Sequence, residues 1–241
     1  MKIEYNGKRK KQPIFSIFKG VFKIFKGKVR VYYVGDKIND GELLVANHAN
    51  KSGPLIYESY LPLYHAKWGA HQMLGSYKER WKYLRNVLYI QKNGWSKGKA
   101  TLKATYEAFF SKYIYKGMKV LPTYQDARLA RTIKKSVATL SNDISLMIYP
   151  EDSSNGYFDV IKKFLPGFVL VMEKYKKVTG KDVPVRPIYY HKKKRIILVG
   201  EASYLEEYQK QNLSREEIAE TIKNELNQLY VKIESGKFDN K

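Results

Sequence analysis

The first amphipathic pattern of the chain lies near its N-terminus, at residues 14–26, which read IFSIFKGVFKIFK. Its apolar residues recur at intervals of three and four, the period of an α-helix, and lysines separate them. Phe15, Phe18, Phe22 and Phe25 would share one face of this helix. Such a face, with lysines beside it and a KRKK tract before it, is typical of a helix lying on an anionic membrane. The same apolar face could instead pack on the protein core. The two interpretations are compatible, since one part of the face could contact the membrane and another part the core.

After this segment the chain alternates β-type runs with helical patterns, which favours an α/β fold. Strands are predicted where apolar and β-branched residues cluster between turn signals, at residues 29–34, 43–46, 87–90, 144–149, 185–189 and 196–199. Helices are predicted from periodic apolar positions, at residues 54–64, 97–110, 126–140, 168–179 and 214–233. We expect residues 1–27 to be a basic amphipathic membrane-surface segment. Residues 28–241 should form a single α/β domain, a mixed sheet flanked by helices.

Residues that can exchange protons or form hydrogen bonds follow two of the predicted strands. Asn47 and His48 come directly after the strand at 43–46, and Glu151 and Asp152 follow the apolar run at 144–149. Ligands of α/β folds bind beyond the carboxyl ends of strands. If the two strand ends lie at the same edge of the sheet, the imidazole and the two carboxyl groups would meet there.

Charge and composition narrow the class of protein. The chain has 45 Lys and Arg against 23 Asp and Glu, a formal net charge of +22. This excess attracts polyanions such as nucleic acid, anionic lipid headgroups or phosphorylated substrates. The absence of cysteine excludes disulfides and thiolate chemistry. No run approaches the ~20 apolar residues that cross a bilayer. We therefore expect a cytoplasmic protein that lies peripherally on the inner face of the membrane.

His48 admits two interpretations, a general base near neutral pH or a structural histidine bonded to a backbone carbonyl. His65, His71 and His191 do not follow predicted strands, and we interpret them as surface or packing residues. The sequence contains no Walker A, GxGxxG, HExxH or GxSxG motif. No cluster of residues has metal-ligand spacing, so neither a metal site nor a resident cofactor is predicted.

Four blocks, in order, resemble those of the 1-acylglycerol-3-phosphate acyltransferase family. Asn47 and His48 resemble the start of its NHxxxxD block, and YPEDSSN at 149–155 resembles FPEGTRS. FLPG at 164–167 is similar to the block F-K-x-G, and VPVRP at 183–187 to VPVVPV. The resemblance covers roughly residues 29–200. It implies a glycerolphosphate acyltransferase-like fold.

The resemblance also implies an activity in phospholipid synthesis. A fatty acyl group would move from acyl-CoA or acyl carrier protein, as co-substrate, to a hydroxyl of a lysophospholipid or glycerol-phosphate-type acceptor. His48 would be the base, and Glu151 and Asp152 would complete the catalytic set. The substrate-binding candidates, from the resemblance and from their charge, are Asn47, Lys51, Ser153, Ser154, Gly167, Arg128 and Arg186.

The chain departs from the family pattern at important positions. Gly53 stands where the family has the Asp that orients the histidine, and Ser154 stands where it has a phosphate-binding Arg. In a Ser-His-Asp triad, losing the orienting carboxylate costs about 10⁴ in rate. Three carboxylates are candidates to replace the Asp, namely Glu58, Asp152 and Glu151. The candidates for phosphate binding are Lys51, Arg128, Arg131 and Arg186.

Two other functions stay open. The chain could be a catalytically degenerate lipid-binding protein of the same fold, with Gly53 and Ser154 marking lost chemistry. It could also bind nucleic acid, but only its charge and tyrosine content favour this, and it has no recognised nucleic-acid motif. We expect no specific nucleic-acid partner.

Overall fold

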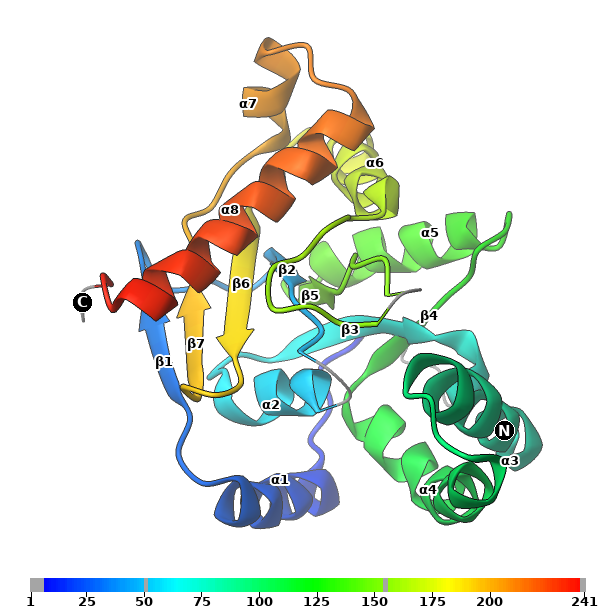
Figure 1. Cartoon of the computed structure of the whole chain (residues 1–241). Coiled ribbons are helices and arrows are strands. Elements are labelled where there is room, and N and C mark those ends of the chain that lie inside the picture. The colour runs from blue at the N-terminus through cyan, green and yellow to red at the C-terminus, as the bar shows by residue number, and fades with distance from the viewer. Residues whose placement is uncertain (1–6, 50–51, 154–155, 239–241) are drawn as a thin grey trace.

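The computed structural model describes residues 7–49, 52–153 and 156–238, and a seven-stranded sheet lies at its centre (Figure 1). The strand order is β1-β7-β6-β2-β5-β3-β4. The strands from β6 to β4 in this order are parallel, whereas β7 is antiparallel to β6 and parallel to β1. The predicted mixed sheet is therefore confirmed. The strands are β1 (Arg30–Tyr33), β2 (Leu43–Ala46), β3 (His65–Ala70), β4 (Val120–Thr123), β5 (Ser145–Ile148), β6 (Val185–His191) and β7 (Ile196–Val199).

Helices cover both faces of the sheet, so the class is α/β, as predicted. The long helix α8 begins with a capping box, in which the side chain of Ser214 accepts from the backbone of Glu217. The helices are α1 (Pro13–Lys26), α2 (Gly53–Tyr60), α3 (Tyr77–Lys82), α4 (Lys97–Gly117), α5 (Leu129–Leu140), α6 (Val169–Thr179), α7 (Leu205–Lys210) and α8 (Arg215–Ser235). Shorter segments are the 3-10 turns η1 (His71–Leu74) and η3 (Pro166–Phe168), and the π-helical η2 (Tyr83–Lys92).

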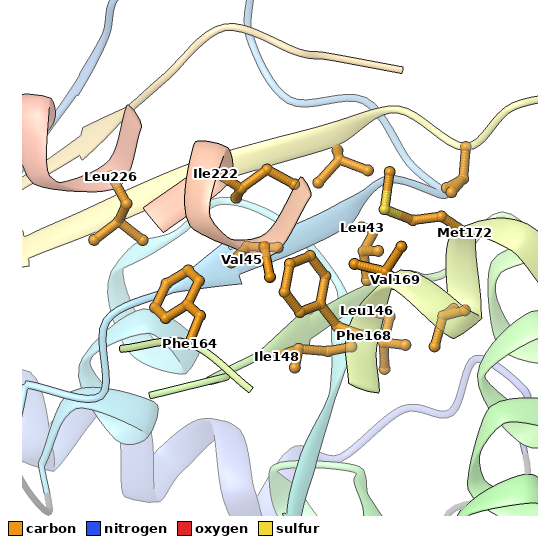
Figure 2. Packing of buried hydrophobic residues seen from close by; sticks show 14 of the residues in the cluster. Leu43, Val45, Leu146, Ile148, Phe164, Phe168, Val169, Met172, Ile222 and Leu226 are labelled. Atoms are coloured by element: carbon orange, nitrogen blue, oxygen red, sulfur yellow. The ribbon is translucent and has the colours of Figure 1, made fainter. Parts of the chain in front are cut away.

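The central strands are apolar on both faces, which is usual for strands covered by helices on each side. Leu43 and Val45 pack into the cluster that α6 and α8 cover, as Figure 2 shows. Leu44 and Ala46 face the other way, into the cluster that contains Ile56 of α2. Successive residues of a strand point to opposite faces. Burying one such side chain contributes about 1.5–3 kcal/mol, so β2 is fixed from both sides.

One predicted strand is wrong and two strands were not predicted. Residues 87–90 lie in the π-helical segment η2, because a short apolar run fits a buried helix as well as a strand. The strands β3 and β4 gave no clear signal. Lys67 and Gly69 interrupt β3, and Pro122 lies within β4, an edge strand where proline is tolerated.

Helix α1 docks on the domain through its inward side. The ring of Phe15 fills a notch at Gly117, where any Cβ would overlap it, and Phe22 packs against the α2 side of the sheet. Lys19 lies 3.6 Å from the carboxylate of Glu58. The hydroxyl of Tyr60 donates to the carbonyl at the end of α1. These contacts fix α1 on the domain.

Candidate active site

The ends of β2 and β5 meet at one edge of the sheet, which confirms that prediction. The two strands are parallel neighbours, with Val45 opposite Ile148. Just beyond them, the backbone N–H of His48 donates to Oε1 of Glu151 at 2.7 Å. The contact joins the first and second blocks of the family resemblance, which lie 103 residues apart in the sequence.

The backbone at His48 and Ala49 is strained and closely packed. Ala49 has a φ of 43°, in the left-handed region that residues other than glycine rarely adopt. Such backbone strain is concentrated at functional sites. A Cβ on Gly53 would overlap the carbonyl oxygen of His48, so glycine permits the close approach of α2. An Asp at position 53 would force this loop to move.

Two tyrosine rings lie beside the imidazole of His48. The ring of Tyr157 stacks on it with centroids 4.8 Å apart, and that of Tyr149 lies at 5.2 Å with a tilt of 59°. Burial raises the pKa of Tyr157 to about 12, so this tyrosine is neutral at physiological pH. The imidazole therefore has an aromatic environment.

Asn47 braces the end of β2 against β6. Its amide nitrogen donates to the carbonyl of Tyr190 at 3.1 Å, and its oxygen accepts from the backbone N–H of Tyr190 at 2.8 Å. The same oxygen accepts from the hydroxyl of Tyr57 at 2.5 Å. Groups of the protein itself thus hold this buried side chain, which sets the position of His48 rather than extending toward a substrate.

Glu151 is a partly buried carboxyl group that titrates near neutral pH. Burial raises its pKa to about 7, against the opposing effects of the His48 N–H and the Lys92 ammonium. Its backbone forms an antiparallel bridge with Phe164. A carboxyl group with this pKa can accept or donate a proton at physiological pH.

Lys92 extends from η2 into the same site. Its ammonium donates to Oγ of Ser153 at 2.6 Å and lies 5.6 Å from the centroid of the Tyr157 ring. Burial lowers its pKa, while Asp152 and Glu151 act in the opposite direction. Sequence reasoning missed Lys92 and Tyr157. Only the fold brings η2 to the turn after β5, and no local pattern marks it.

Two of the expected substrate-binding residues, Arg186 and Arg128, pair with carboxylates of the protein itself. Arg186 is at the opposite edge of the sheet, buried against Glu42 just before β2 at 2.5 Å. Arg128 is exposed, pairs with Asp126 at 2.7 Å and follows the edge strand β4. Gly167 lies in η3, where a Cβ would make only an ordinary contact. Lys51 and Ser154 lie outside the described residues.

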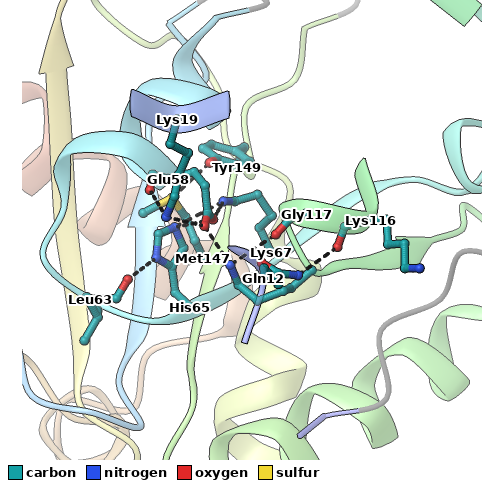
Figure 3. A network of polar contacts seen from close by, with 11 residues as sticks. Gln12, Lys19, Glu58, Leu63, His65, Lys67, Lys116, Gly117, Met147 and Tyr149 are labelled. Carbon is teal, nitrogen blue, oxygen red and sulfur yellow. Dashed lines mark hydrogen bonds and ion pairs between the residues drawn. The ribbon is translucent and has the colours of Figure 1, made fainter. Parts of the chain in front are cut away.

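Glu58, a candidate replacement for the missing Asp, belongs to a buried network of lysines that adjoins the site through Tyr149 (Figure 3). Its Oε2 accepts from Lys67 at 2.6 Å and its Oε1 from Lys119 at 2.7 Å. Burial alone would raise the pKa of Glu58, but these lysines outweigh it and hold the pKa well below its usual range. Both oxygens are thus occupied by ammonium groups. The remaining candidates are Glu151, which accepts from the His48 N–H, and Asp152, the next residue along the chain.

Two histidines that were interpreted as surface or packing residues lie at the two ends of β3. The first agrees with that interpretation, and the second stands at a strand end that was not predicted. His65 begins β3 and is fully buried beside Lys67, and burial lowers its pKa to about 3. His71 directly follows β3, so it also stands at a strand end, on the same edge as His48. Its Nδ1 lies 3.1 Å from the carbonyl oxygen of Thr123. Because β3 was not predicted, this position was not recognised.

The described residues contain no group of three or more His, Asp or Glu side chains that could hold a metal ion. Within the same described ranges, no helix is both long and apolar enough to cross a bilayer. A scan against protein-family models gives no match, and a search of curated proteins gives none.

Proposed function

We propose that the chain is an acyltransferase that works at a membrane surface. The observation that carries the proposal is the contact between His48 and Glu151, which joins two family-like blocks from distant parts of the chain at a carboxyl edge. The donor would be acyl-CoA or acyl carrier protein, and the acceptor a lysophospholipid or glycerol-phosphate-type alcohol. The fold would then be of the glycerolphosphate acyltransferase type.

In this proposal His48 takes the proton of the acceptor hydroxyl. The oxygen attacks the thioester carbonyl, the carbon–sulfur bond breaks, and the proton passes to the leaving thiolate. An ester and a thiol result, with no acyl-enzyme. Asn47 holds His48 at the strand end, and Glu151 fixes the same turn through the His48 N–H.

Lys92 is a better candidate than Arg128 or Arg186 for holding an anionic substrate group. Its half-buried ammonium already lies at the turn after β5, bonded to Ser153 and near Tyr157. Arg186 is committed to Glu42 on the far edge. An ammonium with three donors suits a phosphate oxygen. We assign Lys92 this role, which replaces the arginine absent at position 154.

The outward side of α1 supports work at a membrane surface. Apolar residues of this side are exposed although Phe15 and Phe22 point inward, and they repeat at helical spacing. They are Ile14, Ile17, Phe18, Val21, Ile24 and Phe25. Figure 1 shows the arrowhead of β6 directed toward α2 and α1, and β2 and β5 run parallel to β6. The carboxyl ends of these strands, which precede His48 and Glu151, therefore point toward the end of the molecule that carries α1.

The test is acyl transfer by purified wild type and His48→Ala, assayed with acyl-CoA or acyl carrier protein and lysophosphatidic acid. We expect His48→Ala to lower the rate by about 10²–10⁴-fold, the usual contribution of a general base. His71→Ala is the matched control, because His71 stands at the same sheet edge and should leave the rate unchanged. Full activity in a folded His48→Ala protein would reject the mechanism.

One observation favours a second function, that of a catalytically degenerate lipid-binding protein. Gly53 is packed so closely on the His48 carbonyl that the family's carboxylate has no room there. Binding of lysophospholipid without turnover by wild type would establish this alternative, and turnover would exclude it. Gly53→Asp is a poor test, since its Cβ would displace the loop being tested.

A further inference from the structure

Helix α4 carries a second exposed apolar stripe, within the chain rather than near its end. Leu102 is 78% exposed and Phe109 62% exposed. The whole stripe recurs at helical spacing and consists of Leu102, Tyr106, Phe109, Phe110 and Tyr113. The opposite side of α4 buries Ala100, Ala104 and Ala108 against η1, η2 and α3. Grouped exposed aromatics of this kind mark an interaction surface.

The stripes of α1 and α4 belong to one end of the molecule. Phe15 of α1 fills the notch at Gly117, the last residue of α4, and the amide of Gln12 donates to the carbonyl of Lys116 at 3.4 Å. Figure 1 shows both helices along the lower end of the fold. Because the start of α1 is fixed to the end of α4, the two helices keep the same position relative to each other.

The charge around the stripes favours an anionic lipid surface. Helix α1 has no acidic residue. The single carboxylate of α4, Glu107, is occupied by the Tyr89 hydroxyl and by Lys103. Exposed lysines flank both stripes, namely Lys11, Lys23, Lys26, Lys97, Lys99, Lys103 and Lys116. Lysines beside apolar side chains match acidic headgroups above acyl chains. Two copies of this surface would repel each other.

We propose that α4 is the second half of a two-helix surface that docks the protein on an anionic bilayer. The outward apolar residues of α1 and α4 enter the headgroup region together, and the lysines contact the acidic lipids. The inference rests on the membrane part of the proposed function and not on acyl transfer. It adds that α1 alone does not account for the attachment.

The experiment is co-sedimentation of the full chain with vesicles of phosphatidylcholine, alone or mixed with phosphatidylglycerol. The α4 variant carries Leu102→Ser and Phe109→Ser, and the α1 variant carries Ile17→Ser and Ile24→Ser. The matched control replaces two valines, 60% and 51% exposed on α6 and α8, as Val178→Ser and Val231→Ser. All positions are exposed, and circular dichroism checks that each variant folds.

We expect the α4 pair and the α1 pair each to weaken binding to the mixed vesicles by at least about tenfold, and the valine pair to leave it unchanged. Binding should also fall when phosphatidylglycerol is omitted or salt is raised.

Wild-type binding by the α4 variant, with loss only in the α1 variant, would overturn the role of α4 and leave the proposed function intact. A wild type that binds no vesicles would overturn the whole membrane assignment, while transfer to a soluble acceptor would still test the chemistry. A dimer that the α4 variant dissociates, without vesicle binding, would assign the surface to self-association instead.

Discussion

Glu58 and Glu151 are two carboxyl groups withdrawn from water, and their surroundings differ in kind. Two buried ammonium groups neutralise Glu58, which stays ionised throughout the physiological range. The oxygen of Glu151 accepts from the neutral N–H of His48, and burial raises its pKa to about 7. Burial disfavours the ionised form of both carboxyl groups. Only Glu58 has cationic partners close enough to keep it ionised. Glu58 therefore stays charged within an ion-pair network, whereas the pKa of Glu151 lets it gain or lose a proton near neutral pH.

The largest expected effect comes from breaking the Glu58 network. Glu58→Ala would leave the ammonium groups of Lys67 and Lys119 buried without a carboxylate, and should lower the free energy of unfolding by about 3–5 kcal/mol. Urea unfolding at pH 7 measures it. Glu58→Leu combined with Lys67→Met should recover part of the loss, because a buried charge is removed with its partner. A loss below about 1 kcal/mol would show that the network is not a source of stability.

Because its pKa is raised, Glu151 predicts a stability that falls as pH rises. A carboxyl group with a lowered pKa, such as Glu58, has the opposite effect. The folded pKa of Glu151, about 7, lies above the ordinary value of 4.5, so the folded protein binds more protons between these values. Glu151 thus lowers stability as pH rises from 4.5 to about 7, by roughly 1–3 kcal/mol in total. Glu151→Gln should remove this slope. The difference between wild-type and variant free energies of unfolding across pH isolates it, and an unchanged slope would contradict the assignment.

The smallest expected effect on stability comes from replacing Lys92, which lies near Glu151. This ammonium holds the pKa of Glu151 lower than burial alone would. In Lys92→Met, the stability slope due to Glu151 should therefore end at a higher pH, with a change at pH 7 below about 1 kcal/mol. Lys92→Arg, which keeps the charge, is the control. A slope ending at the same pH in both variants would show that Lys92 does not act on Glu151.

The sequence predicted the parts of the fold that depend on local pattern. Apolar runs located β2 and β5, and the polar residues that follow these strands identified the end of the sheet where His48 and Glu151 lie. β3 was missed because Lys67 looks unsuited to a central strand until Glu58 is known to pair with it. A long-range partner decided that element, and no local pattern could show it.

For the candidate site, the sequence indicated that His48 and Glu151 come together, but it did not indicate the residues around them. His48 and Glu151 follow strands, so the chain order of the blocks indicated them. Lys92 and Tyr157 reach the site only through the packing of η2 and of the turn after β5. Charge alone also suggested Arg186, which the register of β6 puts at the far edge. The type of side chain suggests candidate site residues, and the sheet topology shows which of them lie at the same end of the sheet.

The pairing of β2 with β5 makes the spacing between the backbone segments that carry His48 and Glu151 a property of the sheet. Ladder hydrogen bonds set how far the ends of the two strands stand apart, whatever side chains fill the layers above and below. Substitutions among the apolar residues of these strands should therefore lower the stability of the protein before they separate the His48 backbone from the Glu151 carboxyl group. The distance between the two strand ends should therefore change little when the surrounding apolar residues are substituted.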